Sequence, residues 1–215
     1  MQTRNNYLCW VKVFCSYLLE RSYIKDDPTQ GFSAVHKRGK TKNRDMIPAE
    51  ELHRIRQYLL QKNKHYPLAC YILNYLFVRP KEMSYIKICD INLTEQTVLI
   101  HGQNAKNHND AVLTLPAKVI HLMLDLDIFN APGCYYLFSD DFRPGVNHKS
   151  EKCFRDYWTR HLRQDLQFSV RYKFYSLKDT GITNMIRSNT DILSVRDQAR
   201  HSSILITDTY TPIRI

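Results

Sequence analysis

The chain has 215 residues, 43% of them hydrophobic, which excludes a disordered chain and suits one sizeable domain, or one domain with a helical appendage. Its formal net charge of +10 favours an acidic polymer, nucleic acid above all, as partner, and a merely basic protein is the alternative. Apolar runs stay below the roughly 18 residues that cross a bilayer, and the first residues lack a signal-peptide core, so we expect a cytoplasmic protein without membrane contact.

The first predicted element is an amphipathic helix over residues 4–21, because apolar residues recur there at three- and four-residue spacing. It is followed by a basic segment, which we interpret as a linker over residues 33–45. This linker either is a solvated hinge or lies along a phosphate backbone. Its candidate DNA-binding residues are Lys37, Arg38, Lys40, Lys42 and Arg44.

A larger unit begins near residue 46, with Pro48 at a plausible first helical position and a buried helix predicted over residues 66–78. Short β-rich runs within residues 86–116 predict a small antiparallel sheet whose hairpin tip lies near Lys106. Further helices are expected at 116–127, 150–166, 175–188 and 190–199, with a last short one toward 210. The fold class is therefore α+β and mostly α.

Six cysteines are scattered through the chain without a C-x-x-C pair or a Cys/His spacing suited to zinc. Several of them fall within apolar helical or strand patterns. We therefore expect buried free thiols of a reducing cytoplasm, and no metal site.

Tyr210 follows His201 by nine residues near the end of the chain. A tyrosine held close to a histidine can attack phosphorus, provided that cations elsewhere in the fold stabilise the transition state. Taken alone the pair is weak, because 14 tyrosines and 9 histidines make such spacings common. Most such pairs are a core ring and a surface ring.

Further motifs stand upstream in a fixed order. Arg79 is followed three residues later by Glu82, then comes the predicted hairpin with Lys106, and then the run Tyr175-Ser176-Leu177-Lys178 precedes His201 and Tyr210. Together these segments resemble the catalytic domain of the tyrosine recombinases, the phage integrase family, over residues 46–215. Residues 1–32 resemble the last helix of the helical, SAM-like core-binding domain that precedes it, so the sequence is either a fragment or a member that has lost most of that arm.

The resemblance implies a mechanism that needs neither a cofactor nor a metal. Arg79, braced by Glu82, and His201 would donate hydrogen bonds to the phosphate. Tyr175 and Lys178 occupy the place of the family's His-x-x-Arg motif, here called the second box, and would act on the same phosphate. Lys106 would protonate the departing 5′ oxygen as general acid. Tyr210 would be the nucleophile, holding the 3′ phosphate covalently.

The second box departs from the family pattern, because Tyr175 stands in place of His and Lys178 in place of Arg. Lysine offers a point charge rather than a planar fork, so the exchange is not conservative at a phosphate. Arg200 and Phe77 stand where glycine often precedes the catalytic His and Arg, which predicts altered local turns.

The resemblance implies a site-specific recombinase that is either carried by a mobile element or used for DNA inversion. Integration, excision and inversion all stay open as the direction of exchange. Its partner would be double-stranded DNA in the bacterial nucleoid, bound as a tetramer on two sites, with a monomer when free. Two alternatives remain: a degenerate recombinase that binds DNA without cutting it, and a monomeric enzyme resembling type IB topoisomerases.

Overall fold

The computed structural model describes residues 2–35, 44–105 and 108–211. The chain divides into two compact units, Met1–Lys42 and Asn43–Ile215. The first holds the helix α1, Gln2–Glu20, which confirms the helix predicted over residues 4–21. The Asn5 side chain bonds both backbone groups of Val35, at 3.0 and 3.1 Å, and so ties the returning segment to this helix.

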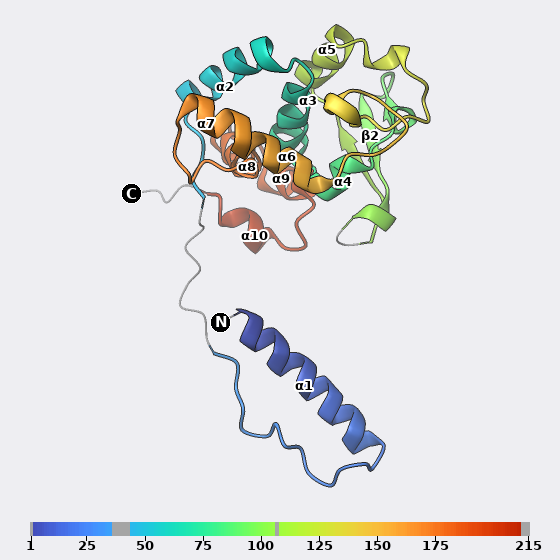
Figure 1. The fold of residues 1–215 in the computed structure, drawn as a ribbon, viewed down its shortest axis with the longest axis vertical. Helices are drawn as coiled ribbons and strands as arrows, with labels where there is room; N and C mark the ends of the chain where they lie inside the picture. The colour runs from blue at the N-terminus through green and yellow to red at the C-terminus, as the bar shows by residue number, and fades with distance from the viewer. Residues whose placement is uncertain (1, 36–43, 106–107, 212–215) are drawn as a thin grey trace. The chain divides into compact units, whose positions relative to one another are not determined.

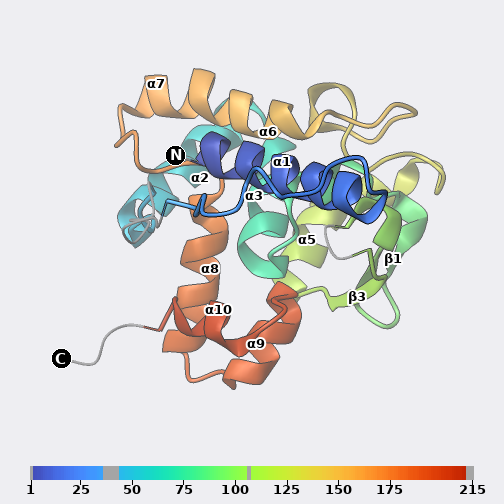
Figure 2. The same cartoon turned by 90° about the horizontal axis from the view of Figure 1, so that it is seen from below.

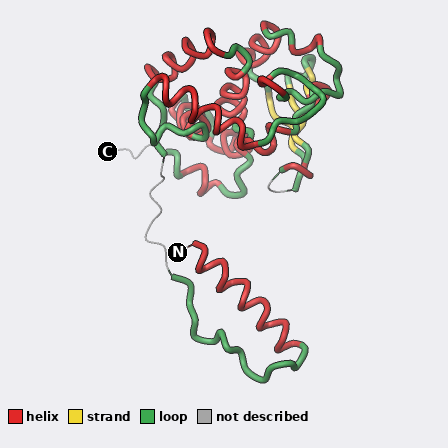
Figure 3. Tube along the Cα trace, in the orientation of Figure 1, coloured by secondary structure: helices red, strands yellow, loops and turns green. Residues whose placement is uncertain are grey.

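The second unit is built mainly of helices (Figures 1 and 3). Its α-helices confirm each helical segment that the periodicity predicted, and an additional short helix, α4, follows Arg79. They are α2 Ala49–Lys62, α3 Tyr66–Tyr71, α4 Pro80–Ser84, α5 Ala117–Asp125, α6 Glu151–Tyr157, α7 Arg163–Leu166, α8 Ser176–Arg187, α9 Ile192–Ala199 and α10 Ile204–Asp208. No helix in these described ranges is long and apolar enough to cross a membrane.

A three-stranded antiparallel sheet lies at one end of this unit, beside α5 and away from α2 (Figures 1 and 2). Its strands are β1 Ile91–Asn92, β2 Thr97–Ile100 and β3 Ala111–Thr114, in the order β1-β2-β3. Val98 pairs with Leu113, and both side chains point into the core. The predicted α+β, mostly α fold with a small antiparallel sheet is confirmed.

Two helical segments contain a wider π turn. The turn Ile72–Leu76 continues α3, and the turn Trp158–Leu162 joins α6 to α7. The helix predicted over 66–78 therefore ends two residues early, because Phe77 takes the left-handed conformation, with φ of 58°. The left-handed turn at Phe77 ends the helix, and the chain continues in an extended conformation at Arg79, which precedes α4.

A group of aromatic side chains lies in the main core of the second unit, where Tyr66, Phe154, Trp158 and Phe174 are fully buried. The buried Tyr66 hydroxyl donates to the Phe154 carbonyl at 2.7 Å, so the polar end of this ring is satisfied.

A second, smaller cluster consists of Phe77, Ile182, Val195 and Ala199, and Tyr210 packs partly against it. This cluster therefore helps to position the ring of Tyr210, the predicted nucleophile.

The cysteines are free thiols, as expected. The expectation that they are buried is confirmed for Cys15 and Cys70 but wrong for three others, because Cys9, Cys89 and Cys134 are exposed. Cys9 lies in α1, Cys89 in the short 3-10 helix Ile88–Asp90 and Cys134 in a turn.

Gly181 brings α8 into direct contact with the π turn after α3. A Cβ atom at this position would overlap the Asn74 carbonyl oxygen and lie 2.8 Å from the Phe77 ring. We expect Gly181→Ala to lower the free energy of unfolding by about 3 kcal/mol, the upper end of the usual cost of overpacking, because backbone cannot move aside as a side chain can. Urea denaturation measures this loss.

Gly133→Ala is the matched control, since its added Cβ would meet Cys89 only at an ordinary 3.4 Å. We expect this variant to unfold within about 0.5 kcal/mol of the native chain. Equal stabilities of the two variants would contradict the close packing of α8 on the π turn.

Candidate active site

Arg79 and Glu82 form a local pair at the start of α4. The Arg79 Nη1 donates to Glu82 Oε1 at 3.0 Å, and the Arg79 backbone N–H donates to Glu82 Oε2 at 2.8 Å. The carboxylate thus caps α4 and orients the guanidinium at once. The Glu82 side chain is 1% exposed, whereas that of Arg79 is 23% exposed and so reaches the surface.

Arg200 binds the same carboxylate from the end of α9, its Nη2 donating to Glu82 Oε2. Burial raises the pKa of Glu82, but the charges and hydrogen bonds of Arg200 and Arg79 outweigh it and hold that pKa below its ordinary value. Two guanidinium groups therefore share one ionised carboxylate. This role of Arg200 was not predicted from the sequence.

Phe77 and Arg200, the two residues that stand in place of glycine, have φ of 58° and 52°. Both lie in the left-handed region that glycine favours. Both residues therefore take a backbone conformation that glycine adopts without strain. That these turns differ from those of the family stays a prediction.

Lys178 lies on the buried face of α8 and is 2% exposed. Its Nζ donates to the Phe77 carbonyl at 2.7 Å and reaches the Ala199 carbonyl at 3.5 Å. Burial first, and then the charges of Arg79 and Arg200, lower its pKa to about 7, against the opposing effect of Glu82 and Asp179. The ammonium holds together the two turns that present Arg79 and Arg200.

This pKa makes the stability of the fold depend on pH. Between pH 7 and 9 the folded chain releases the Lys178 proton while the unfolded chain, with its ordinary pKa of 10.5, keeps it, so the free energy of unfolding rises with pH. We expect a rise of about 2 kcal/mol over this range relative to Lys178→Met, which lacks the titrating group. Parallel curves for the two proteins in urea denaturation at several pH values would contradict a depressed pKa.

Asp179, next along α8, is the centre of a second group. Its buried carboxylate forms an ion pair with Arg44 and accepts a hydrogen bond from the Tyr210 hydroxyl. The Arg44 guanidinium lies 4.7 Å from the centre of the Tyr175 ring. Arg44, expected in the linker as a DNA contact, thus takes part in the candidate site, and its contact with DNA stays a prediction.

The two candidate phenols are held in their neutral form. Burial, together with Asp179, raises the pKa of Tyr210, and Arg44 only partly opposes this. Burial also raises the pKa of Tyr175, although Arg79 and Arg44 oppose it. In this arrangement Tyr210 needs a proton acceptor before it can attack, and Asp179 is the carboxylate at its hydroxyl.

His201 stacks on the predicted nucleophile. The His201 and Tyr210 rings are 5.9 Å apart and nearly parallel, at 14°. The His201 Nδ1 lies 2.9 Å from the Thr207 hydroxyl, which is in α10, so the last helix fixes the imidazole.

A cationic cleft opens beside Arg79 and Tyr175. It encloses about 530 Å³ between α4, α6 and the loop before α8. Its cations far outnumber its single carboxylate, Glu151, which suits a polyanion. The cations are Arg79, Lys81, Lys152, Arg155, Arg163 and Lys173.

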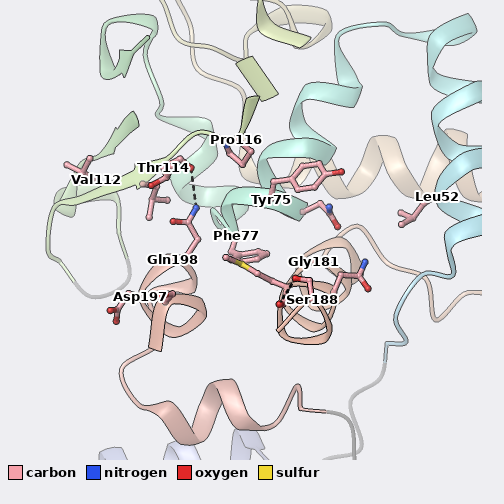
Figure 4. A pocket seen from close by; sticks show the side chains of 15 residues that line it. Leu52, Tyr75, Phe77, Val112, Thr114, Pro116, Gly181, Ser188, Asp197 and Gln198 are labelled. Atoms are coloured by element: carbon pink, nitrogen blue, oxygen red, sulfur yellow. Dashed lines mark hydrogen bonds between the residues drawn. The ribbon is translucent and has the colours of Figure 1, made fainter. Parts of the chain in front are cut away.

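A separate groove of about 810 Å³ lies over Phe77, Gly181 and Met185 (Figure 4). Gln198 borders it and donates to the Thr114 carbonyl at 3.3 Å. Asp197 is the charged residue of its lining, so this groove lacks the cations that a phosphate requires.

Several predicted site residues lie outside the described residues. They are Lys106 at the predicted hairpin tip and the linker residues Lys37, Arg38, Lys40 and Lys42. The remaining ones, from α4, α8 and the segment around α10, meet in the two groups around Glu82 and Asp179.

A family model described as the phage integrase family matches residues 45–214. The chain belongs to the phage integrase family. One relative is a tyrosine recombinase of Agathobacter rectalis. It is 24% identical to this chain over 144 residues, which are 64% of this chain and 44% of the relative. The chain thus spans less than half the length of that relative.

Solved structures of the family share the fold. The integrase of transposon Tn1549, in complex with a circular intermediate DNA, matches with a TM-score of 0.77 at 11% identity, covering 100% of this chain and 76% of that one. The recombinase XerH, bound to a palindromic difH substrate, matches with a TM-score of 0.73 at 18% identity, covering 98% and 63%. The resemblance to tyrosine recombinases is therefore confirmed.

Proposed function

We propose that this phage integrase family chain is a site-specific recombinase that cuts and rejoins DNA through a covalent bond between Tyr210 and a 3′ phosphate. One observation carries the proposal: residues from four separated segments meet around Glu82 and Asp179, beside a cationic cleft. They bring guanidinium groups, a phenol and a carboxylate base together, the components that phosphoryl transfer requires.

The proposed cleavage step is a transesterification. The Tyr210 oxygen attacks phosphorus, its proton passes to the Asp179 carboxylate, and the bond from phosphorus to the 5′ oxygen breaks. The 5′ oxygen takes a proton, which we assign to Lys106, and leaves as a hydroxyl. Reversal by another 5′ hydroxyl rejoins the strand, so no external energy source is consumed.

The cations divide the remaining work. Arg79 and His201 donate hydrogen bonds to the non-bridging oxygens, whose charge grows in the transition state, and Tyr175 adds its hydroxyl. Lys178 donates a hydrogen bond to the Phe77 carbonyl and so positions the backbone that leads to Arg79. These groups take the place of a divalent metal.

Double-stranded DNA is the proposed partner, in the nucleoid of a bacterial cytoplasm. The cationic cleft supports this, as do relatives that were solved on DNA. We propose a tetramer on two duplexes for strand exchange, because four strands must be cut and each copy carries one Tyr210. A monomer is expected in the absence of DNA.

A second function, DNA binding without cleavage, is favoured by one observation. Lys178 donates to the Phe77 carbonyl instead of offering its charge to the cleft, so the second box contributes no guanidinium to a phosphate. The two functions differ in whether a covalent adduct forms.

The test is capture of DNA by the 215-residue chain from a pool of duplexes that carry a nick within a randomised stretch. A cut beside the nick releases a short fragment, which prevents religation and traps the adduct. We expect selected sequences to migrate with the protein on a denaturing gel, in the presence of EDTA and without ATP, because the site cations replace the metal. Capture only with added magnesium contradicts the mechanism, and retention without any adduct favours the second function.

DNA affinity is expected to fall steeply with salt. If six phosphates are neutralised by the cleft cations, affinity should drop roughly a thousandfold between 50 and 200 mM salt, because condensed counterions are released on binding. Fluorescence anisotropy on a labelled duplex measures this slope. Arg155→Gln should weaken binding to all sequences about equally, since phosphate contacts do not read bases, and a flat salt dependence would contradict the cleft as the DNA site.

A further inference from the structure

The ammonium group of Lys178, the lysine of the second box, is hydrogen-bonded to backbone carbonyls. Lys178 is 2% exposed, and its Nζ is held by the carbonyls of Phe77 and Ala199. A lysine so placed stabilises two turns, but it cannot offer the planar pair of donors that a guanidinium offers to a phosphate. The site therefore lacks a second guanidinium at this position.

Arg200 supplies a guanidinium beside Arg79. Its side chain is 5% exposed, and its Nη2 binds one oxygen of Glu82, while Arg79 binds the other oxygen. Two guanidinium groups on the two oxygens of one carboxylate lie close enough for a single phosphate to contact both. Two positive charges against one negative charge leave an excess that favours an anion.

Two donors of Arg200 are left over. Its Nε and Nη1 are buried, and among the described residues neither has a hydrogen-bond partner. A buried donor without a partner costs about 1–3 kcal/mol, and such donors are rare in folded proteins, so each one calls for an explanation such as a catalytic role. The Glu82 ion pair explains Nη2 alone, so a purely structural role leaves the other two nitrogens unexplained.

We propose that Arg200 is a catalytic residue that contacts a non-bridging oxygen of the DNA phosphate being cut, alongside Arg79. It thereby supplies the second guanidinium that Lys178 does not provide. The two nitrogens are covered in this structure, so the contact requires neighbouring side chains to move when DNA enters. This inference rests on the proposed recombinase function.

The first test compares two suicide duplexes, one with an ordinary scissile phosphate and one with an uncharged methylphosphonate at that place. We expect Arg200→Ala to slow adduct formation about a hundredfold or more on the phosphate, the scale of losing one preorganised donor. On the methylphosphonate the loss should largely disappear, because the charge that Arg200 stabilises is absent. If Arg200 had a purely structural role, Arg200→Ala would be slowed equally on both substrates, and that result overturns the proposal.

Arg196→Ala is the matched control, because Arg196 lies on the same helix and pairs with Asp197 on the surface. It removes one positive charge without touching Glu82, and we expect wild-type rates on both substrates. A loss equal to that of Arg200→Ala would assign the effect to overall charge and overturn the proposal.

A second measurement does not depend on cleavage or on Arg200→Ala folding. In the arginine side-chain N–H spectrum of the ¹⁵N-labelled chain, the Arg200 Nε signal is identified by its loss in Arg200→Lys. We expect this signal to shift saturably with inorganic phosphate and with the captured duplex. An unchanged signal overturns the phosphate contact. If the wild-type chain forms no adduct on any duplex, the recombinase function fails, while the phosphate titration still decides the anion site.

Discussion

Tyr210→Phe is expected to abolish the covalent protein–DNA adduct, a loss of at least about 10⁴-fold in cleavage, while DNA affinity stays unchanged. Only the phenolic oxygen is removed. The ring keeps its stacking on His201 and its packing against the cluster around Phe77, and the variant loses the hydrogen bond to Asp179. Denaturing gels detect the adduct, and anisotropy measures the affinity.

Tyr58→Phe is a matched control outside the site. The Tyr58 hydroxyl also donates to a carboxylate, Asp165, at 2.6 Å, so both variants lose a phenol–carboxylate bond worth about 1–2 kcal/mol. We expect full adduct formation by this control. An adduct on Tyr210→Phe at the native rate would remove Tyr210 from the mechanism.

Glu82→Gln is expected to lower the free energy of unfolding by about 3–5 kcal/mol, the cost of removing one partner from a buried ion pair. The amide keeps the shape of the side chain but leaves the buried Arg200 guanidinium without its counter-charge. It also weakens the brace on Arg79, so cleavage should fall as well. Urea denaturation measures the stability directly.

Glu51→Gln provides the comparison, since Glu51 and Arg54 form an arginine–glutamate pair with the same three-residue spacing on the exposed face of α2. An exposed pair contributes about 0–1 kcal/mol, so this variant should unfold nearly as the native chain does. Equal losses in the two variants would mean that Arg200 and Arg79 do not depend on Glu82.

The fold was predictable because periodicity reports which face of each element is buried. Ile55 and Leu59 of α2 and Val98 and Leu113 of the sheet are buried as the pattern indicates. The π turns were not predictable, because one extra residue in a helical turn leaves the apolar spacing nearly unchanged. The left-handed Phe77 was missed for a related reason: sequence patterns associate that conformation with glycine.

The candidate site was predictable where a residue type and a spacing recur, as at Arg79, His201 and Tyr210. The ion pairs of Arg200 with Glu82 and of Arg44 with Asp179 join residues 118 and 135 positions apart, and no local pattern indicates such pairs. One signal was present in the sequence. Arginine in place of glycine at 200 accompanies the loss of arginine at 178, and a charge lost and regained within one site suggests a relocated guanidinium.

The most direct measurement is the identity of the residue that carries DNA after capture by the wild-type chain. The adduct is digested with protease and nuclease, and the peptide that retains a 3′-linked nucleotide is sequenced by mass spectrometry. We expect a single modified peptide, from the segment after His201, with the nucleotide on Tyr210. A nucleotide on another tyrosine, or a bond to a 5′ phosphate, would contradict the proposed mechanism.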